Sequence, residues 1–126
     1  MASVAAGARS LDGVVVAIRP GLDPGESAGD ASVVIATNLG EARNAVLVAS
    51  ADAVIAIGGS WGTLSEVALA LRRARDLPVG ALPVVSLGGW QIQDSAGKLI
   101  PGLLLATDPE HAVALALGKP DKSPSD

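Results

Sequence analysis

The 126-residue sequence is 49% hydrophobic, so it is long enough to bury one hydrophobic core and too short for two domains. Its net charge of −4 and its 2% of aromatic residues argue against binding to polymeric nucleic acid, which requires a basic surface and stacking side chains. It has no cysteine and a single histidine, His111, which excludes disulfides, thiolate chemistry and a histidine-rich metal site.

Apolar runs and amphipathic patterns alternate along the chain. In chain order they predict a helix over 1–8, a strand over 13–18, a loop over 19–31, a strand over 32–36, a helix over 40–52, a strand over 53–57, a helix over 63–75, a strand over 82–87, a loop over 88–98, a strand over 102–106 and a helix over 108–118. Asp108 is the expected N-cap of the last helix, Pro109 its first residue and Gly118 its stop.

This alternation is typical of an α/β fold. We expect a Rossmann-like, three-layer arrangement with a mostly parallel sheet, whose β-branched strands are buried on both faces. Residues 1–118 are expected to form one nucleotide- or phosphate-binding domain, followed by a flexible tail over 119–126. No apolar run approaches the roughly 20 residues that span a bilayer, and residues 1–13 lack the basic n-region and long apolar stretch of a signal peptide. We therefore expect a cytoplasmic protein with no membrane partner.

A glycine-rich turn lies between the predicted strand 53–57 and the helix that follows it. Glycines let a phosphate approach the backbone, and the free amides and dipole of the helix attract an anion. A plain strand–turn–helix connection is the alternative, but the spacing favours a phosphate site. The residues concerned are Gly58, Gly59, Ser60, Trp61, Gly62 and Thr63.

Glu66 has two interpretations. Thr63 and Glu66 fit the S/T-x-x-E capping box, in which the glutamate only helps to start the helix. Alternatively, a carboxylate one turn into the helix lies beside a phosphate-bound sugar and acts on it.

Arg43 and Asn44 open the helix that precedes the glycine-rich turn. A cation in a first helical turn is disfavoured by the dipole, so Arg43 is directed at a ligand, is paired with Glu41 or an upstream aspartate, or is a surface residue. Asn44 is a candidate ligand-binding residue, whereas Asn38 is expected to cap the helix.

The two tryptophans and the histidine are less specific signals. Trp61 is placed to stack on a base or pterin, or to cover an interface. Trp90, after Gly88 and Gly89, lines the mouth of the same site or fills the core or an interface, of which the core or an interface is favoured. His111 is expected to be a surface residue.

Two segments together resemble the LOG superfamily. They are Gly40-Glu-Ala-Arg-Asn44 and, after a buried strand, Gly58-Gly-Ser-Trp-Gly-Thr-Leu-Ser-Glu66. That superfamily includes the Lonely Guy cytokinin-activating phosphoribohydrolases, proteins formerly labelled lysine decarboxylases, and molybdenum cofactor carrier proteins. The similarity runs from Met1 to about Gly118 and is greatest to the small bacterial branch around the cofactor carriers.

The resemblance implies specific roles for the motif residues. In the hydrolases an arginine and the glutamate of Pro-Gly-Gly-x-Gly-Thr-x-x-Glu are catalytic, which implies Arg43 and Glu66 here, and the glycines and threonine of the motif hold the 5′-phosphate. Ile57 replaces the proline of that motif and Asn44 replaces a lysine, and both changes are typical of the cofactor-carrier branch. Family members also begin with a strand–helix–strand unit that is missing before Met1, so the resemblance implies an N-terminally truncated chain.

Two functions follow from this resemblance. One is a phosphoribohydrolase that cleaves the N-glycosidic bond of a nucleoside 5′-monophosphate and requires no cofactor. The other is a non-catalytic carrier of a phosphorylated pterin such as the molybdenum cofactor, or a nucleotide sensor. A third hypothesis is an inactive fragment. The expected partners are a small phosphorylated ligand and further copies of the chain, as a homodimer or higher homo-oligomer.

Overall fold

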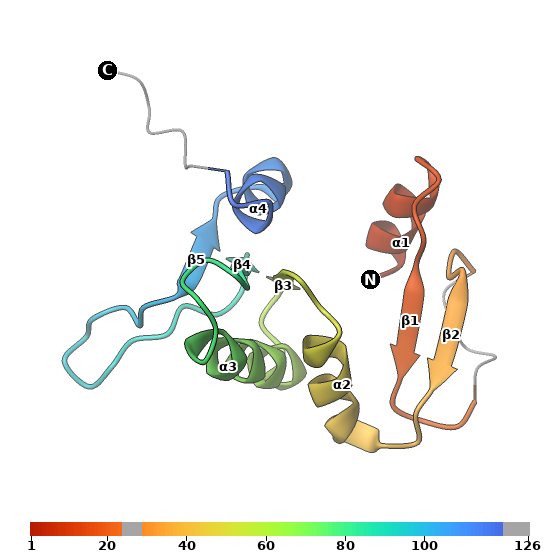
Figure 1. The fold of residues 1–126 in the computed structure, drawn as a ribbon, viewed down its shortest axis with the longest axis horizontal. Helices are drawn as coiled ribbons and strands as arrows, with labels where there is room; N and C mark the ends of the chain where they lie inside the picture. Colours follow the sequence, from red (N-terminus) through yellow and green to blue (C-terminus); the bar gives the residue numbers. More distant parts are fainter. Residues whose placement is uncertain (24–28, 120–126) are drawn as a thin grey trace. The chain divides into compact units, whose positions relative to one another are not determined.

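The computed structural model describes residues 1–23 and 29–119. The chain splits into two compact units, Met1–Leu47 (unit 1) and Val48–Asp126 (unit 2). Figure 1 labels the elements, which are α1 (Ala2–Arg9), β1 (Val16–Arg19), β2 (Val33–Ala36), the 3-10 helix η1 (Gly40–Ala42), α2 (Arg43–Ala49), β3 (Val54–Ile57), α3 (Trp61–Arg75), β4 (Val84–Leu87), β5 (Leu103–Ala106) and α4 (Pro109–Ala116). The tail predicted over 119–126 lies outside the described residues from residue 120 onward.

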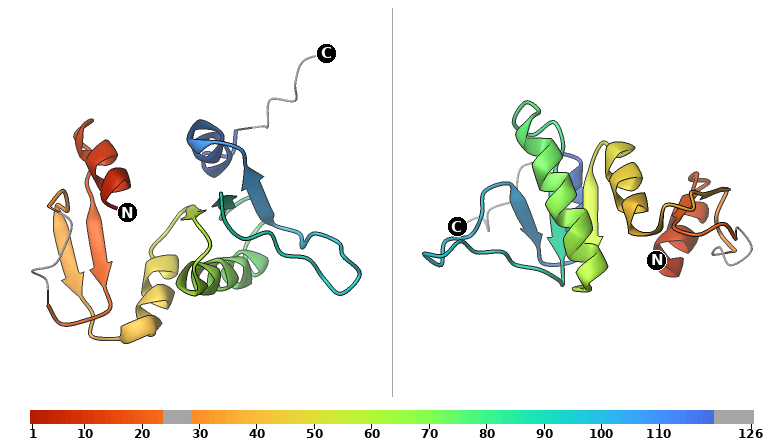
Figure 2. Two further views of the ribbon diagram at one scale, coloured as in Figure 1. Left: turned by 180° about the vertical axis from the view of Figure 1, so that it is seen from behind. Right: turned by 90° about the horizontal axis from the view of Figure 1, so that it is seen from below.

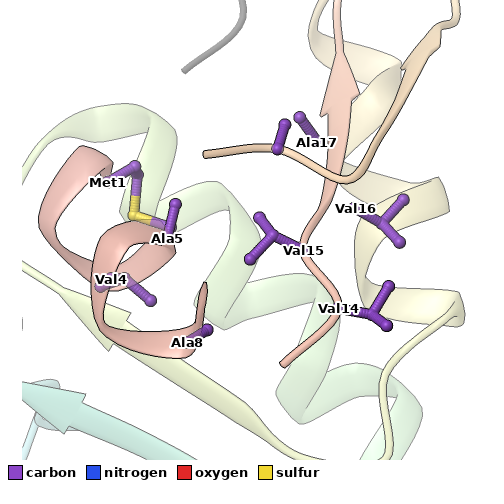
Figure 3. Close-up of a pocket in the computed structure, with 9 residues that line it drawn as sticks. Met1, Val4, Ala5, Ala8, Val14, Val15, Val16 and Ala17 are labelled. Atoms are coloured by element: carbon purple, nitrogen blue, oxygen red, sulfur yellow. The ribbon is translucent and has the colours of Figure 1, made fainter. Parts of the chain in front are cut away.

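Unit 1 contains a parallel pair of strands, β1 and β2, in which Val16 is registered with Val33 and Arg19 with Ala36. The side chains of Val16, Val33 and Ile35 are 47%, 49% and 45% exposed. The expectation that these strands are buried on both faces is therefore wrong for β1 and β2. The physical reason is that these three side chains share one face of the strand pair and Val16 is directed away from α1 (Figure 3), so α1 does not cover them.

Unit 2 is a three-layer α/β/α arrangement. Its parallel sheet has the order β3-β4-β5, with α3 and α4 on opposite faces (Figures 1 and 2). The sequence offers no phenylalanine or tyrosine, so small and β-branched side chains fill the interior. The fully buried positions are Val67 and Ala70 of α3 with Val84 and Val85 of β4. The mixed α/β fold with parallel strands is confirmed.

Arg73 ties α3 to the end of α2. Its Nη1 donates hydrogen bonds to the carbonyl oxygens of Val48 at 2.7 Å and Ala51 at 2.8 Å. The last carbonyls of a helix lack intrahelical partners and carry the negative end of the dipole, so a guanidinium there is stabilising. This contact holds the segment before β3 against α3.

The helix predicted over 40–52 is shorter than expected. Residues 40–42 form a 3-10 turn, because Gly40 has a φ of +56° and Ala42 bonds back to Leu39, and the α-helix covers only 43–49. Asn38 is not the cap: Leu39 holds that position without a side-chain bond, and Asn38 itself has a φ of +52°. The sequence pattern does not distinguish a 3-10 entry from an α-helical one, because 3-10 turns are frequent at the ends of α-helices and three residues are too few to show a period.

Candidate phosphate-binding site

The carboxyl ends of β3, β4 and β5 lie level with one another. Ile57 is registered with Leu87, and Leu87 with Ala106. Each strand is followed at once by a turn, so Gly58, Gly88 and Thr107 begin at the same edge of the sheet. In open parallel sheets this edge is where ligands bind.

The helix that follows β3 begins at Trp61, two residues before the predicted start, and Ser60 is its N-cap. Ser60 has an extended backbone, and its Oγ accepts a hydrogen bond from the Thr63 amide at 3.1 Å. The capping box predicted for Thr63 and Glu66 is therefore wrong. Ser60 is as good a cap as Thr63, and Gly62, predicted to lie in the turn, is accommodated inside the first helical turn.

Consecutive backbone amides are left without acceptors at this helix start. The Thr63 amide donates to Ser60 Oγ, and the Leu64 amide donates to the Ser60 carbonyl oxygen. Among the residues that the structure describes, the N–H groups of Gly59, Ser60, Trp61 and Gly62 donate to no acceptor. A run of unpaired N–H groups at the positive end of a helix is the arrangement that binds phosphate.

The N-terminus of α4, at the same sheet edge, differs in charge. Asp108 caps it by accepting from the His111 amide at 2.8 Å, and Glu110 lies in its first turn, so the sequence-predicted cap and the first-turn proline are confirmed. Carboxylates compensate the dipole of α4. The first turn of α3 has no acidic residue and its cap is a neutral serine. An incoming anion therefore meets an uncompensated helix start at α3 rather than at α4.

Glycine pairs bring the turns after β3 and β4 into direct contact. Gly58 adopts a φ of +84°, and its amide donates to the Leu87 carbonyl at 3.1 Å. A Cβ placed on Gly89 would overlap the carbonyl oxygen of Gly58. At Gly59, in contrast, the nearest atom to such a Cβ is the Gly89 Cα at 3.9 Å. The fold thus requires Gly89. Around Gly59 there is room for a Cβ beside the free amides.

Trp90 belongs to this edge, which was the less favoured of its interpretations. Its indole Nε1 donates to the Ser60 carbonyl at 2.9 Å, and its ring lies 5.2 Å from that of Trp61, tilted by 39°. Its own carbonyl accepts from Ser86 Oγ at 2.9 Å. The expectation that Trp90 fills the core is wrong, whereas a place in an interface stays a prediction. The diglycine before Trp90 resembles the one after β3 and was the available signal.

Glu66 is half-buried on α3, six residues after the cap. No described residue forms a hydrogen bond or an ion pair with its carboxylate, and Ser60 rather than Glu66 accepts the bond from the Thr63 amide at the helix start. Glu66 lies on the same face of α3 as Thr63, Ala70 and Arg73, because these positions recur every three or four residues. With the capping role assigned to Ser60, Glu66 has no structural partner in the described chain.

Arg43 and Asn44 belong to unit 1. Arg43 donates from Nη1 to the carbonyl oxygen of Ile18 at 2.9 Å, and its Nε is buried without a hydrogen-bond partner. Pairing with Glu41 or an upstream aspartate is wrong, because the described acceptor is this main-chain carbonyl. Asn44 is buried, with 5% of its surface exposed. The catalytic roles that the resemblance implies for Arg43 and Glu66 stay predictions.

His111 is half-buried rather than a surface residue. Its Nδ1 accepts a hydrogen bond from the Thr107 amide at 3.1 Å. This bond fixes the imidazole against the turn that follows β5, so His111 shapes the last turn of the sheet edge.

A groove of about 340 Å³ lies in unit 1, between α1 and the residues around β1. Figure 3 shows Val15 directed toward the helix and Val14 and Val16 directed away from it. Its lining side chains are all apolar and none of them can donate a hydrogen bond to a phosphate; the residues are Met1, Val4, Ala5, Ala8, Val14, Val15, Val16, Ala17 and Ala31. In residues 1–23 and 29–119 there is also no cluster of ligands for a metal ion, and no helix long and apolar enough to cross a membrane.

Comparison with known proteins places this geometry in a family. The model of the SLOG cluster4 family, within the SMF/DprA-LOG superfamily, matches residues 1–113. An uncharacterized protein of Archaeoglobus fulgidus is 43% identical over 89 residues, which cover 70% of this chain and 58% of that protein. The chain thus spans little more than half the length of this relative.

Solved structures with the same fold include a molybdenum cofactor binding protein from the phototrophic bacterium Rippkaea orientalis. The two are 30% identical with a TM-score of 0.74, over 94% of this chain and 69% of the other. A structural genomics target, TM1055, is 26% identical with a TM-score of 0.60, over 91% of this chain and 70% of that one. The resemblance to the LOG superfamily inferred from the glycine motif is confirmed.

Proposed function

Since the chain belongs to the SLOG cluster4 family, we propose that it binds a small phosphate monoester at the start of α3. The observation that carries this proposal is the set of unpaired amides at Gly59, Ser60, Trp61 and Gly62. Phosphate oxygens accept several hydrogen bonds at once, and the dipole of a 15-residue helix adds attraction for their charge.

Two ligand classes fit a site of this kind. A nucleoside 5′-monophosphate presents its phosphate to the amides and its sugar to the surrounding turns. A phosphorylated pterin presents the same terminal group, and the similarity to the molybdenum cofactor binding protein of Rippkaea orientalis supports this class. Both share a monoester phosphate, which is the group that the amides recognise.

The first candidate activity is hydrolysis of the N-glycosidic bond of a nucleoside 5′-monophosphate. Water adds to C1′ of the sugar, the bond to the base breaks, and the base leaves with a proton, giving ribose 5-phosphate. The transition state carries positive charge on the sugar ring, which a carboxylate stabilises. Glu66 supports this candidate because it is half-buried and has no capping role.

The second candidate is a carrier or sensor that holds the ligand without reaction. It is favoured by the structural similarity to a molybdenum cofactor binding protein and by Ile57 and Asn44, which depart from the hydrolase pattern. Glu66 then contacts the bound ligand without breaking a bond. Both candidates require the same phosphate contact, so binding is tested first.

Calorimetric titration of the 126-residue chain with AMP and adenosine tests this contact. We expect AMP to bind at least about tenfold more tightly than adenosine, since only AMP accepts hydrogen bonds from the unpaired amides. Gly59→Ala is expected to lower AMP affinity by about tenfold, because its methyl group occupies the open space beside those amides.

Gly7→Ala, in α1, is the matched control, since no atom lies within 4 Å of a Cβ there. It is expected to leave AMP affinity unchanged. Equal binding of AMP and adenosine, or an unchanged AMP affinity in Gly59→Ala, contradicts the proposed phosphate site.

A further inference from the structure

Trp61 and Trp90 form an aromatic pair directly beside the unpaired amides. Trp61 is the first residue of α3, so its own amide belongs to the proposed phosphate site while its ring extends from the same backbone. Trp90 is anchored to the preceding residue, Ser60, through the bond from its Nε1. The pair is therefore fixed to the turn at both members.

The Trp61 side chain is 78% exposed. A tryptophan that is neither buried nor hydrogen-bonded to a described residue leaves a large apolar face in water, which is unfavourable unless a partner covers it. Trp90 is half-buried and lies 5.2 Å from it at a tilt of 39°, so it supports one side of the ring and leaves the other open.

Packing of the core does not require a tryptophan at position 61. Aromatic residues make up 2% of the sequence, and the core is built from valine, leucine and alanine. Both tryptophans nevertheless lie at the turn that carries the unpaired amides, and neither is part of the fully buried set. This location therefore places unpaired, anion-binding amides next to a flat apolar face.

Building on the proposed phosphate site, we infer that the ligand carries a planar heterocycle that stacks on the exposed face of Trp61, with Trp90 supporting the ring from behind. Purine and pterin rings share this chemistry. The amides select the phosphate and the tryptophan selects the ring, so a sugar phosphate without a ring fills only half of the site. Trp61 is then a specificity-determining residue that does not contact the phosphate with its side chain.

The test compares AMP, neopterin monophosphate and ribose 5-phosphate by calorimetry, using wild type, Trp61→Ala and Trp61→Phe. Wild type is expected to bind a ring-bearing ligand about tenfold or more tightly than ribose 5-phosphate. Trp61→Ala removes this difference and leaves ribose 5-phosphate affinity unchanged, whereas Trp61→Phe retains most of it. The two tryptophans are the only strong fluorophores in a chain without tyrosine, so ring binding also changes the intrinsic emission.

Val113→Ala, which truncates a 51% exposed apolar side chain on α4, is the control and is expected to bind every probe as wild type does. The inference is overturned if wild type binds ribose 5-phosphate as tightly as both ring-bearing ligands, or if Trp61→Ala weakens all probes equally. It is also overturned if Trp61→Ala changes only the sedimentation of the chain, since the ring then covers a second copy. If no phosphorylated probe binds, the phosphate site itself fails, which is a different result.

Discussion

Replacing Gly89 with alanine is expected to lower the free energy of unfolding by about 3 kcal/mol, the largest stability effect of any single glycine in the site. The added methyl group would overlap the carbonyl oxygen of Gly58, so the backbone of one turn must move. Because the Gly58 amide is bonded to Leu87, this movement also disturbs the pairing of β3 with β4. Urea denaturation followed by tryptophan emission measures the effect.

Two other glycines provide a graded control for this prediction. Gly58→Ala is expected to cost about 1 kcal/mol, because its φ of +84° is unfavourable for a residue with a side chain although no atom lies within 4 Å of its Cβ. Gly59→Ala is expected to change stability by less than about 0.5 kcal/mol. If Gly89→Ala unfolds at the same urea concentration as Gly59→Ala, the close approach of the two turns is not a feature of the folded protein.

The substitution Glu66→Gln distinguishes the hydrolase candidate from the carrier candidate. If the chain hydrolyses AMP, the substitution is expected to reduce the release of ribose 5-phosphate by at least about 100-fold, the usual range for losing a positioned catalytic carboxylate. Binding of AMP and stability are expected to stay close to wild type, since no described residue pairs with Glu66 and Ser60 caps the helix. Quenched-flow or steady-state assays of ribose 5-phosphate, with calorimetry on the same samples, measure both quantities.

Glu110→Gln is the matched control, because Glu110 is an exposed glutamate in the first turn of α4. It is expected to leave turnover unchanged. Wild type that binds AMP without releasing ribose 5-phosphate supports the carrier and contradicts the hydrolase. Turnover that survives in Glu66→Gln contradicts the assignment of Glu66 and leaves the phosphate site intact.

The strands were predictable because their signal is local. Runs such as Val54–Ile57 are continuous, apolar and rich in β-branched residues, and every strand expected from such a run is present among the described residues. Four strands begin one or two residues late and end where expected, and β1 covers 16–19 instead of 13–18. The α4 cap was predictable for the same reason, since Asp108, Pro109 and the helix they start are adjacent in sequence.

The start of α3 was not predictable, because Ser60 and Thr63 are both good caps three residues apart. Thr63 and Glu66 together match a capping box, and a glycine inside a helix is unfavourable. The sequence pattern therefore favours a helix start at Thr63 over one at Trp61. In the structure Gly62 costs the helix little at its first turn, where the amides are unpaired in any case. The choice of Ser60 is what leaves Glu66 without a structural role.

The partners of Trp90 and Arg43 depend on tertiary structure. Trp90 reaches Ser60, 30 residues away in sequence, only because β3 and β4 pair in the register that aligns Ile57 with Leu87. Arg43 reaches the Ile18 carbonyl across 25 residues. No local pattern specifies either contact, so the sequence could place the candidate phosphate turn but not the side chains that surround it.

The most direct test of the central claim is a titration of the ¹⁵N-labelled chain with AMP, observed through its backbone amide resonances. The account predicts that the amide signals of Gly59, Ser60, Trp61 and Gly62 shift most, in the direction of stronger hydrogen bonding, while Thr63, already bonded to Ser60, shifts less. AMP binding that leaves these signals in place, or that perturbs chiefly the apolar groove residues such as Val4 and Val15, would contradict it.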